Sequence, residues 1–431
     1  MTANFGIVFL ALASLGQLLL PRRWAVLPLL MTFAWMPRGQ LIMIDGTALT
    51  FLRLIIVLGF LRCMLRREGL SSGWNAMDSI WTAWGVWIVA SWGFHDSNDL
   101  AFRCGLVWDY LGSYFLLRVF VRDMADIRRL IGLSGLVLAP IGVLMLVEYS
   151  SGENPFEAMG GLMTQSREGK FRAAGPFAHP ILAGTVGAAC LVLAMSLWHR
   201  HPMTSIVGVA AGAAIVFSAA SSGPVLMVCF ALLAMMLWKA RSGIGLVLGA
   251  GIAGIAVLQI VMNDPFYYLM ARVDIVGGST GWHRAQLIHA ALEHLDEWWL
   301  VGTDFTRHWM PTGIQANAQH TDLTNHYLVM GVLGGLPLML TFVASIALAF
   351  RWIGNAALRS NLPDSDKFQM WAVGAALFGH VMNFFTAHLF DQSIVSLMML
   401  LAISATLDEA RSVASLPALQ TDEPPRFGWV G

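Results

Sequence analysis

Charged residues are scarce in this sequence. Of its 431 residues, 12% are Asp, Glu, Lys or Arg and 57% are hydrophobic, whereas charged residues make up about a quarter of an ordinary globular domain. So few charges cannot cover the surface of a water-soluble enzyme of this length. Most of the chain must therefore face lipid, which excludes most cytosolic enzymes and any disordered regulator.

The sequence also has no net charge and no cysteine motif of a metal site or redox centre. The 26 basic and 26 acidic residues cancel, so no nucleic-acid partner is expected, because that binding depends on neutralising phosphates. HExxH, Walker A and GxSxG motifs are absent, and we expect no metal or other cofactor. The cysteines stand singly in apolar stretches, without a CxxC or Cys/His ligand spacing; they are Cys63, Cys104, Cys190 and Cys229.

The chain instead contains about a dozen apolar runs of the length that a transmembrane helix needs, roughly 20 residues. The run at 24–37 is short enough to be a re-entrant segment. We therefore predict an all-α polytopic membrane bundle of 12 or 13 transmembrane helices over residues 1–408, with a short cytoplasmic tail at 409–431. The runs are 4–20, 24–37, 50–65, 79–94, 100–121, 130–149, 177–198, 203–220, 223–239, 243–262, 323–352, 369–390 and 392–408.

Lys and Arg in short loops indicate the orientation of the chain, because they collect on the cytoplasmic side. Basic clusters follow every second predicted span, so all of them can lie on that side. The intervening segments 150–176 and 263–322 then face the other side, which is the periplasm in a bacterial inner membrane. The clusters are Arg22–Arg23, Arg62–Arg67, Arg118–Arg129, His199–His201, Lys239–Arg241 and Arg351–Lys367.

The outer segment 263–322 is where chemistry is expected. At about sixty residues it is far longer than an ordinary connection, and it is too rich in Tyr and Trp for a disordered linker. Its apolar periodicity predicts a helix over 282–300 along the outer surface, so the periplasmic loop is expected to be helical. Ser279 or Thr280 would cap this helix at its start, and Gly302 follows its end.

Half of the twelve histidines lie in this segment or at the start of the next span. Such a density suits an active site, but solvated polar residues at an interface would give the same pattern. His289 and His294 are five residues apart, so a helix would not place them on one face as zinc ligands, and a metalloprotease is not expected. The six are His283, His289, His294, His308, His320 and His326.

Arginines in the outer segments suit a phosphate ligand. Arg172 lies just before the span 177–198, and Arg272 and Arg284 lie in the long segment. A guanidinium is always charged, and its planar fork binds phosphate oxygens in a bidentate manner. At the outer leaflet these residues would bind a lipid diphosphate or simply anchor the chain to lipid head groups. A diphosphate needs more than one guanidinium, so we expect Arg172 and Arg284 to converge on one pocket.

Polar residues inside the predicted spans allow a different function. Asp109 lies in the middle of one span, and His380, Asn383 and His388 can share one side of another, facing a polar cavity open to the outside. A charge at the bilayer centre is costly. These residues are therefore either structural hydrogen-bonding groups or the substrate or proton path of a transporter or lipid-linked glycan flippase.

Four stretches occur in the order and loop placement of a known family. They are YFLLRVFVRDMADIRRL (114–130), FRAAGPFAHPILAG (171–184), WHRAQLIHAALEHLDEWWLVGTDF (282–305) and HTDLTNHYLVMGVLGGLPLML (320–340). Together they resemble the O-antigen ligase and O-antigen polymerase superfamily of polytopic envelope glycosyltransferases, over about residues 100 to 400. The family commonly has a His-Asn pair where this chain has Asn325 followed by His326.

The resemblance implies a metal-independent glycosyltransferase of O-antigen or exopolysaccharide assembly. Such an enzyme transfers a glycan from an undecaprenyl-diphosphate carrier to an acceptor sugar hydroxyl on the periplasmic side. Arg172 and Arg284 would clamp the diphosphate and stabilise its negative charge as it leaves. Arg272 and His179 are further candidates for binding the diphosphate or the substrate.

A catalytic base for the acceptor hydroxyl is expected in the segment 320–326, where the chain enters the span 323–352. His320 ranks first, because its distance from Gly331 resembles the family's spacing; His326 ranks second and Asp322 third. If the helix starts near Asp322, His326 follows one turn later, and the carboxylate can hold the imidazole tautomer. Alternatively, Asp322 is only the N-cap of that helix.

Several alternatives stay open. A lipid A core as acceptor would make the chain a ligase, and another lipid-linked glycan would make it a polymerase. Membrane lipid and other polysaccharide assembly proteins are possible partners. Besides an enzyme and a transporter, a non-catalytic assembly scaffold is a third class, in which the loop arginines would be dispensable.

The charge bias predicts which positions are reachable from outside the cell. Cysteines introduced at Ser166 and Ser279, in a background without the native cysteines, should react with a membrane-impermeant maleimide in intact cells. A cysteine at Ser360 should react only after lysis, which also serves as the control for reactivity. The reverse pattern would invert the topology and contradict the assignment of the outer segments.

Overall fold

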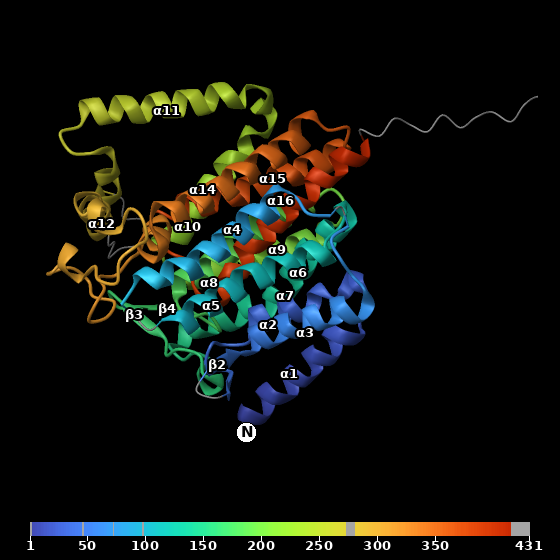
Figure 1. Ribbon diagram of the computed structural model, residues 1–431. Helices are drawn as coiled ribbons and strands as arrows, with labels where there is room; N and C mark the ends of the chain where they lie inside the picture. The colour runs from blue at the N-terminus through green and yellow to red at the C-terminus, as the bar shows by residue number, and fades with distance from the viewer. Residues whose placement is uncertain (1, 45–46, 72, 97–98, 273–280, 415–431) are drawn as a thin grey trace, which may run out of the picture.

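The structure, a computed structural model, is mainly helical. Over the described residues the all-α class is confirmed, since helices make up nearly all of the regular structure (Figure 1). The strands there form two hairpins, β1 (Leu41–Ile44) with β2 (Thr47–Thr50) and β3 (Gln165–Arg167) with β4 (Lys170–Arg172). The described residues are 2–44, 47–71, 73–96, 99–272 and 281–414.

Each predicted apolar run contains a helix. In the first half of the chain the helices are α1 (Thr2–Leu19), α2 (Val26–Trp35), α3 (Phe51–Arg66), α4 (Ala76–Ala90), α5 (Leu100–Val107), α6 (Ser113–Phe120), α7 (Met124–Ser151) and α8 (Pro180–Met195). In the second half they are α9 (Pro202–Ser218), α10 (Ser222–Met236), α11 (Ile244–Val261), α12 (Gly281–Glu293), α13 (Leu295–Trp298), α14 (His326–Arg359), α15 (Asp364–Asn383) and α16 (Ile394–Ala414).

Within the described residues, three helical stretches are long and apolar enough to cross a membrane. They are α7, α14 and the combined stretch Ser222–Val261, in which a 3-10 turn at Leu237–Gly243 joins α10 to α11. Shorter apolar helices occupy Phe5–Leu19, Pro180–Met195, Pro202–Ser218 and Asp391–Thr406. Length and composition therefore support membrane-spanning helices in this chain.

Two predicted helix boundaries are wrong at the end of the bundle that carries the polar residues. α14 begins at His326, later than predicted, because the Asn325 side chain caps it by accepting the Leu328 N–H at 3.1 Å. α15 ends at Asn383. Residues 384–390 are therefore a connection between helices and not the end of a span.

Two further predictions change at other boundaries. The predicted helix over 282–300 is divided at His294 into α12 and α13, and its proposed caps, Ser279 and Thr280, lie outside the described residues. Of the predicted tail, 409–414 belongs to α16. Residues 415–431 lie outside the described part of the chain.

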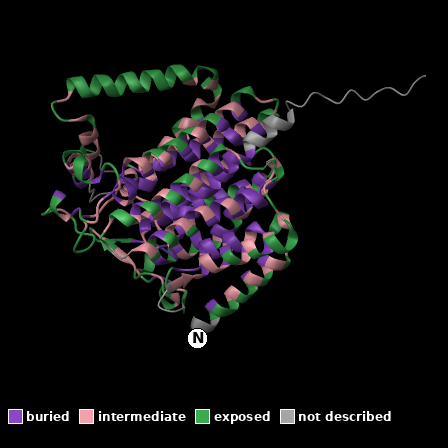
Figure 2. Ribbon diagram, viewed as in Figure 1, coloured by how far each residue is buried: buried purple, intermediate pink, exposed green. Residues whose placement is uncertain are grey.

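The core lies where α4, α6, α14 and α16 meet α7, α8 and α15 (Figure 2). Two charged groups inside it pair with each other: Asp78 of α4 lies 3.3 Å from Arg118 of α6, both fully buried, and the Tyr114 hydroxyl donates to Asp78 at 2.7 Å. Asp109 forms a two-bond ion pair with Arg53, at 2.7 and 2.8 Å. Buried charges of this kind are structural, because breaking such a pair costs about 3–5 kcal/mol.

Helix α11 stands apart from this bundle (Figures 1 and 2). It is apolar along its length, and none of its residues is buried. A helix that is hydrophobic all round is stable only inside a protein core or in lipid. Its surface therefore requires a bilayer or another apolar surface around it.

A kink in α14 holds the outer segment against the bundle. Gly334 and Gly335 are non-helical, with φ +72° at Gly335. The kink leaves backbone groups free for the outer segment: the Leu336 N–H donates to the Trp299 carbonyl at 2.7 Å, and the Thr303 N–H donates to the Val332 carbonyl at 2.9 Å. A Cβ on Gly335 would overlap the Leu300 carbonyl group.

Gly335→Ala should therefore destabilise the protein. The positive φ alone costs about 1–3 kcal/mol for a residue with a side chain, and the overlap with Leu300 adds to it. Thermal unfolding in detergent should show a lower Tm. Gly354→Ala is the matched control in the same helix, since a Cβ there meets nothing and alanine favours a helix by about 1 kcal/mol. Equal Tm values for the two variants would contradict the docking role of the kink.

Candidate functional site

A cavity of about 360 Å³ lies at one end of the bundle, under the outer segments. Its walls come from the β3–β4 hairpin, the start of α8, the turn between α9 and α10, α12, the residues before α14 and the connection from α15 to α16. The polar residues of its lining are Arg167, Arg172, His179, Ser221, Ser222, Arg284, Asp322, Thr324, Thr386 and His388.

The expected convergence of Arg172 and Arg284 is confirmed, since both line this cavity. Arg167 is a third guanidinium, which the sequence reasoning missed. It comes from the same hairpin as Arg172: Glu168 and Gly169, both at positive φ, form a two-residue turn typical of a hairpin. The strand pairing then puts Arg167 and Arg172 on one face.

The hairpin is fixed to the bundle through the residues that follow it. The N–H groups of Ala174 and Gly175 donate to the Glu148 carboxylate at 3.0 and 2.8 Å. The Ala173 N–H donates to the Ser218 carbonyl at 2.9 Å. Arg172 is thereby held in place, and only 7% of the residue is exposed.

The cavity guanidiniums have few partners. Arg172 donates to the Ser221 hydroxyl at 3.2 Å, but its Nε and the Nε of Arg284 are buried without a hydrogen-bond partner among the described residues. No ion pair of Arg167, Arg172 or Arg284 occurs in that part of the chain. Buried donors of this kind need an acceptor. An anion with several oxygens would satisfy them.

The three positive charges also act on one another. Burial, together with the charges of Arg167 and Arg172 and against the opposing charge of Asp322, lowers the pKa of the Arg284 guanidinium to about 10. Burial, and then Arg167, likewise lower the pKa of Arg172. Both groups stay charged at neutral pH, so the cavity carries a concentrated positive field with one carboxylate, Asp322, in its lining.

His179 is a neutral member of the site. It is the N-cap of α8, and its Nδ1 accepts the Ile181 N–H at 3.1 Å. Burial lowers the pKa of His179 to about 4, and the positive charges of Arg172, His388 and Arg167 act in the same direction. Because Nδ1 is an acceptor, the single proton lies on Nε2. His179 can therefore donate a hydrogen bond to a bound ligand without adding charge.

His388 also lines the cavity, from the connection between α15 and α16. Burial lowers the pKa of His388, while Asp322 and a hydrogen bond with the Leu323 backbone oppose this. The other two residues of the expected polar face lie elsewhere: His380 is fully buried, and the Asn383 amide donates to the Thr185 hydroxyl at 2.8 Å. Of that predicted face, the structure brings only His388 to the cavity.

The candidates for a base are separated by the structure. Asp322 lines the cavity, whereas His320 and His326 do not. His320 contacts the Thr306 hydroxyl through Nδ1 at 3.2 Å, and burial lowers its pKa against the opposing charge of Asp304. Arg272 is exposed at the end of a 3-10 turn, outside the cavity lining.

The prediction that Asp322 and His326 lie one helical turn apart as a dyad is wrong. Because Asn325 is the N-cap of α14, Asp322 lies before the helix and is neither its cap nor one helical turn from His326. His326 is fully buried, and its Nδ1 accepts the Leu389 N–H at 3.2 Å. It thus fixes the backbone next to His388.

The sequence matches no protein-family model, and no curated protein matches it significantly. The chemistry of the cavity is therefore the basis for a functional proposal. Three guanidiniums, two serine hydroxyls and a neutral imidazole suit a multiply charged phosphate group.

The lowered pKa of His179 makes stability depend on pH. Below pH 6.5 the unfolded chain protonates this residue and the folded chain does not, so stability falls as the pH drops from 6.5 towards 4. His179→Asn keeps an N-cap but cannot titrate. The variant should match the wild type at pH 8 and lose less of its Tm between pH 6.5 and 4. If the Tm of the variant and that of the wild type fell equally between pH 6.5 and 4, the result would contradict a buried neutral His179.

Proposed function

We propose that this chain is a polytopic inner-membrane glycosyltransferase of 12 or 13 spans, whose cavity faces the periplasm. It transfers or polymerises a glycan from an undecaprenyl-diphosphate carrier onto an acceptor sugar hydroxyl. The observation that carries the proposal is the meeting of Arg167, Arg172 and Arg284 in one cavity without ion-pair partners among the described residues.

The position of the cavity supports a membrane enzyme with its site on one side. The walls include the starts of α8, α10 and α14 and the connection after α15, all at one end of the bundle. Three of the basic clusters lie at the opposite ends of the same helices: His199–His201 after α8, Lys239–Arg241 after α10 and Arg351–Lys367 at the end of α14 and the start of α15. A helix as long as α14 separates its two ends by about 50 Å. This arrangement supports our inference that the cavity and these basic loops lie on opposite sides of the bilayer, with the cavity on the periplasmic one.

The cavity residues account for binding and departure of the diphosphate. The guanidiniums of Arg172 and Arg284 bind the phosphate oxygens, and they gain interaction energy as the bond from the anomeric carbon to the diphosphate oxygen breaks. The diphosphate leaves with the bonding electrons. Arg167 and the His179 N–H add donors to the same group.

A base is also present in the cavity. The acceptor hydroxyl oxygen forms a bond to the anomeric carbon while its proton passes to Asp322 or His388, which are the lining groups able to accept one. A direct displacement of this kind inverts the configuration at that carbon. His320 and His326, ranked highest from the sequence, then act from outside the cavity, His326 by fixing the backbone beside His388.

The transporter or flippase alternative has less support. Of the residues named for a path across the membrane, Asp109 is ion-paired with Arg53 and His380 is fully buried in the core. His388 belongs to the one-sided cavity. A scaffold would have no need for unpaired buried guanidiniums.

Deletion of the gene in the producing cell tests the reaction. Lipid-linked glycan should accumulate on the periplasmic face, where an added glycosidase can reach it in spheroplasts. Accumulation of glycan that the glycosidase reaches only after lysis would instead indicate a flippase. Unchanged lipid-linked glycan would contradict both.

Complementation tests the arginine clamp. Arg172→Lys and Arg284→Lys should each lower glycan transfer at least tenfold at equal protein level, because lysine keeps the charge but loses the bidentate fork; tenfold corresponds to about 1.4 kcal/mol of transition-state stabilisation. Arg351→Lys is the matched control, since Arg351 is exposed at the far part of α14. Normal transfer by both cavity variants would rule out the clamp.

A further inference from the structure

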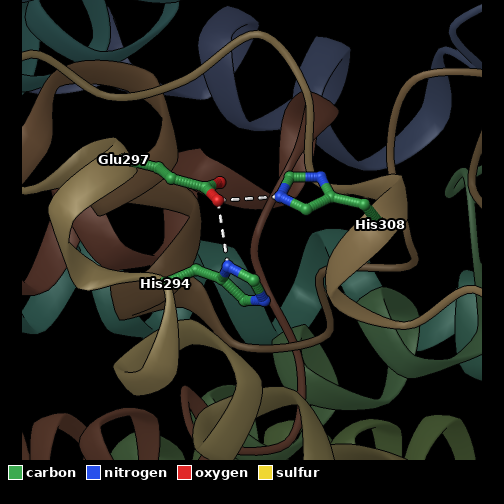
Figure 3. A group of neighbouring side chains, drawn as sticks. All are labelled: His294, Glu297 and His308. Carbon is green, nitrogen blue, oxygen red and sulfur yellow. Dashed lines mark hydrogen bonds and ion pairs between the residues drawn. The ribbon is translucent and has the colours of Figure 1, made fainter.

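A second cluster of polar side chains lies on the outer segment, away from the cavity. His294, Glu297 and His308 point their side chains at one another (Figure 3). The Glu297 Oε1 atom lies 2.9 Å from the His294 Nδ1 and 2.9 Å from the His308 Nε2. The three potential ligand atoms all lie within 4.8 Å of one another. None of these residues lines the cavity.

The local fold holds these side chains in place. His294 stands at the break between α12 and α13, Glu297 lies in α13, and His308 belongs to the 3-10 turn Arg307–Trp309. The Trp309 indole N–H donates to the second carboxylate oxygen, Oε2, at 2.9 Å.

Aromatic neighbours orient both imidazole rings. The His294 ring is parallel to the Trp309 ring, at 6° and 6.0 Å between centroids, and the His308 ring is parallel to that of Phe305, at 5° and 5.2 Å. Trp309 is itself part of a small core that includes Leu328 of α14. The ring positions therefore depend on packing as well as on the shared carboxylate.

The donor set fits a metal ion better than hydrogen bonding alone. Two imidazole nitrogens converge on one carboxylate oxygen, and two nitrogens with one oxygen are a typical zinc ligand set. A tetrahedral Zn²⁺ with ligand bonds of about 2.0–2.1 Å needs ligand atoms roughly 3.3 Å apart. The two oxygen–nitrogen separations, 2.9 Å each, are slightly shorter than this value, and all three atoms lie within 4.8 Å of one another. The hydrogen bond from Trp309 to Oε2 is the outer partner that a ligating carboxylate usually has.

We propose that His294, Glu297 and His308 bind one divalent transition-metal ion, with Zn²⁺ as the best match to the donor set. All three side chains are partly exposed, between 31% and 38%, so water completes the fourth position. The ion ties α13 to the 3-10 turn across the connection 299–306. The ion stabilises the fold of the outer segment that carries Arg284. Its binding does not depend on the glycan-transfer function.

Zinc titration of the whole protein tests this site. The full chain, purified in detergent with a tag that lacks histidine and stripped of metal, should bind one Zn²⁺ with a Kd in the micromolar range or below by calorimetry. His308→Ala and Glu297→Gln should each weaken binding by more than about 100-fold, and Trp309→Phe by roughly 10–100-fold, the usual effect of losing an outer partner. Gel filtration checks that each variant stays folded.

The matched control is His289→Ala. His289 also faces a glutamate, Glu293, at 3.3 Å in α12, but the pair has no third ligand among the described residues, so this variant should bind zinc like the wild type. With Co²⁺ as a probe, the wild type should show the visible absorption of a four-coordinate ion. Absence of saturable binding, wild-type binding by His308→Ala, or an equal loss in His289→Ala would each overturn the proposal.

Discussion

A guanidinium buried in an apolar helix bundle needs a partner, because an uncompensated buried charge costs about 3–5 kcal/mol. The bundle meets this constraint at Arg118 with Asp78, and at Arg62 with Glu68 at 2.8 Å and with the Leu20 carbonyl. The cavity arginines have no such partner in the described part of the chain, so their place in the fold depends on a ligand or on water. The same side chain thus has a carboxylate partner inside the bundle and lacks one, among the described residues, at its end.

The helices could be predicted from sequence because burial and lipid contact both demand apolar runs of a certain length. Their ends could not be predicted as well. The start of α14 is set by one side-chain hydrogen bond of Asn325, although Asp322 is an equally good capping residue by type. The kink at Gly334 and Gly335 depends on docking with residues 299–303, and a glycine pair inside an apolar run does not reveal that partner.

Part of the candidate site could be predicted from the sequence for a related reason. Arg172 and Arg284 stand out because arginines are rare in an apolar chain and both lie in long outer segments. Arg167 lies in one of those segments too, but only the hairpin register puts it beside Arg172. His388 reaches the cavity because α15 ends early, and Glu297 meets His308 because the outer helix breaks at His294. Contacts of this kind depend on packing, which residue spacing along a helix does not encode.

The two walls of the cavity are attached to the bundle in different ways. The hairpin wall is joined by hydrogen bonds to α7 and α9 through Glu148 and Ser218. The opposite wall, α12, follows α11, a helix with no buried residue of its own. α12 itself is held by apolar packing, since Leu287, Ala290 and Ala291 lie in a small core with Trp298 and Leu328. One wall is thus fixed by directional hydrogen bonds and the other by non-directional apolar packing.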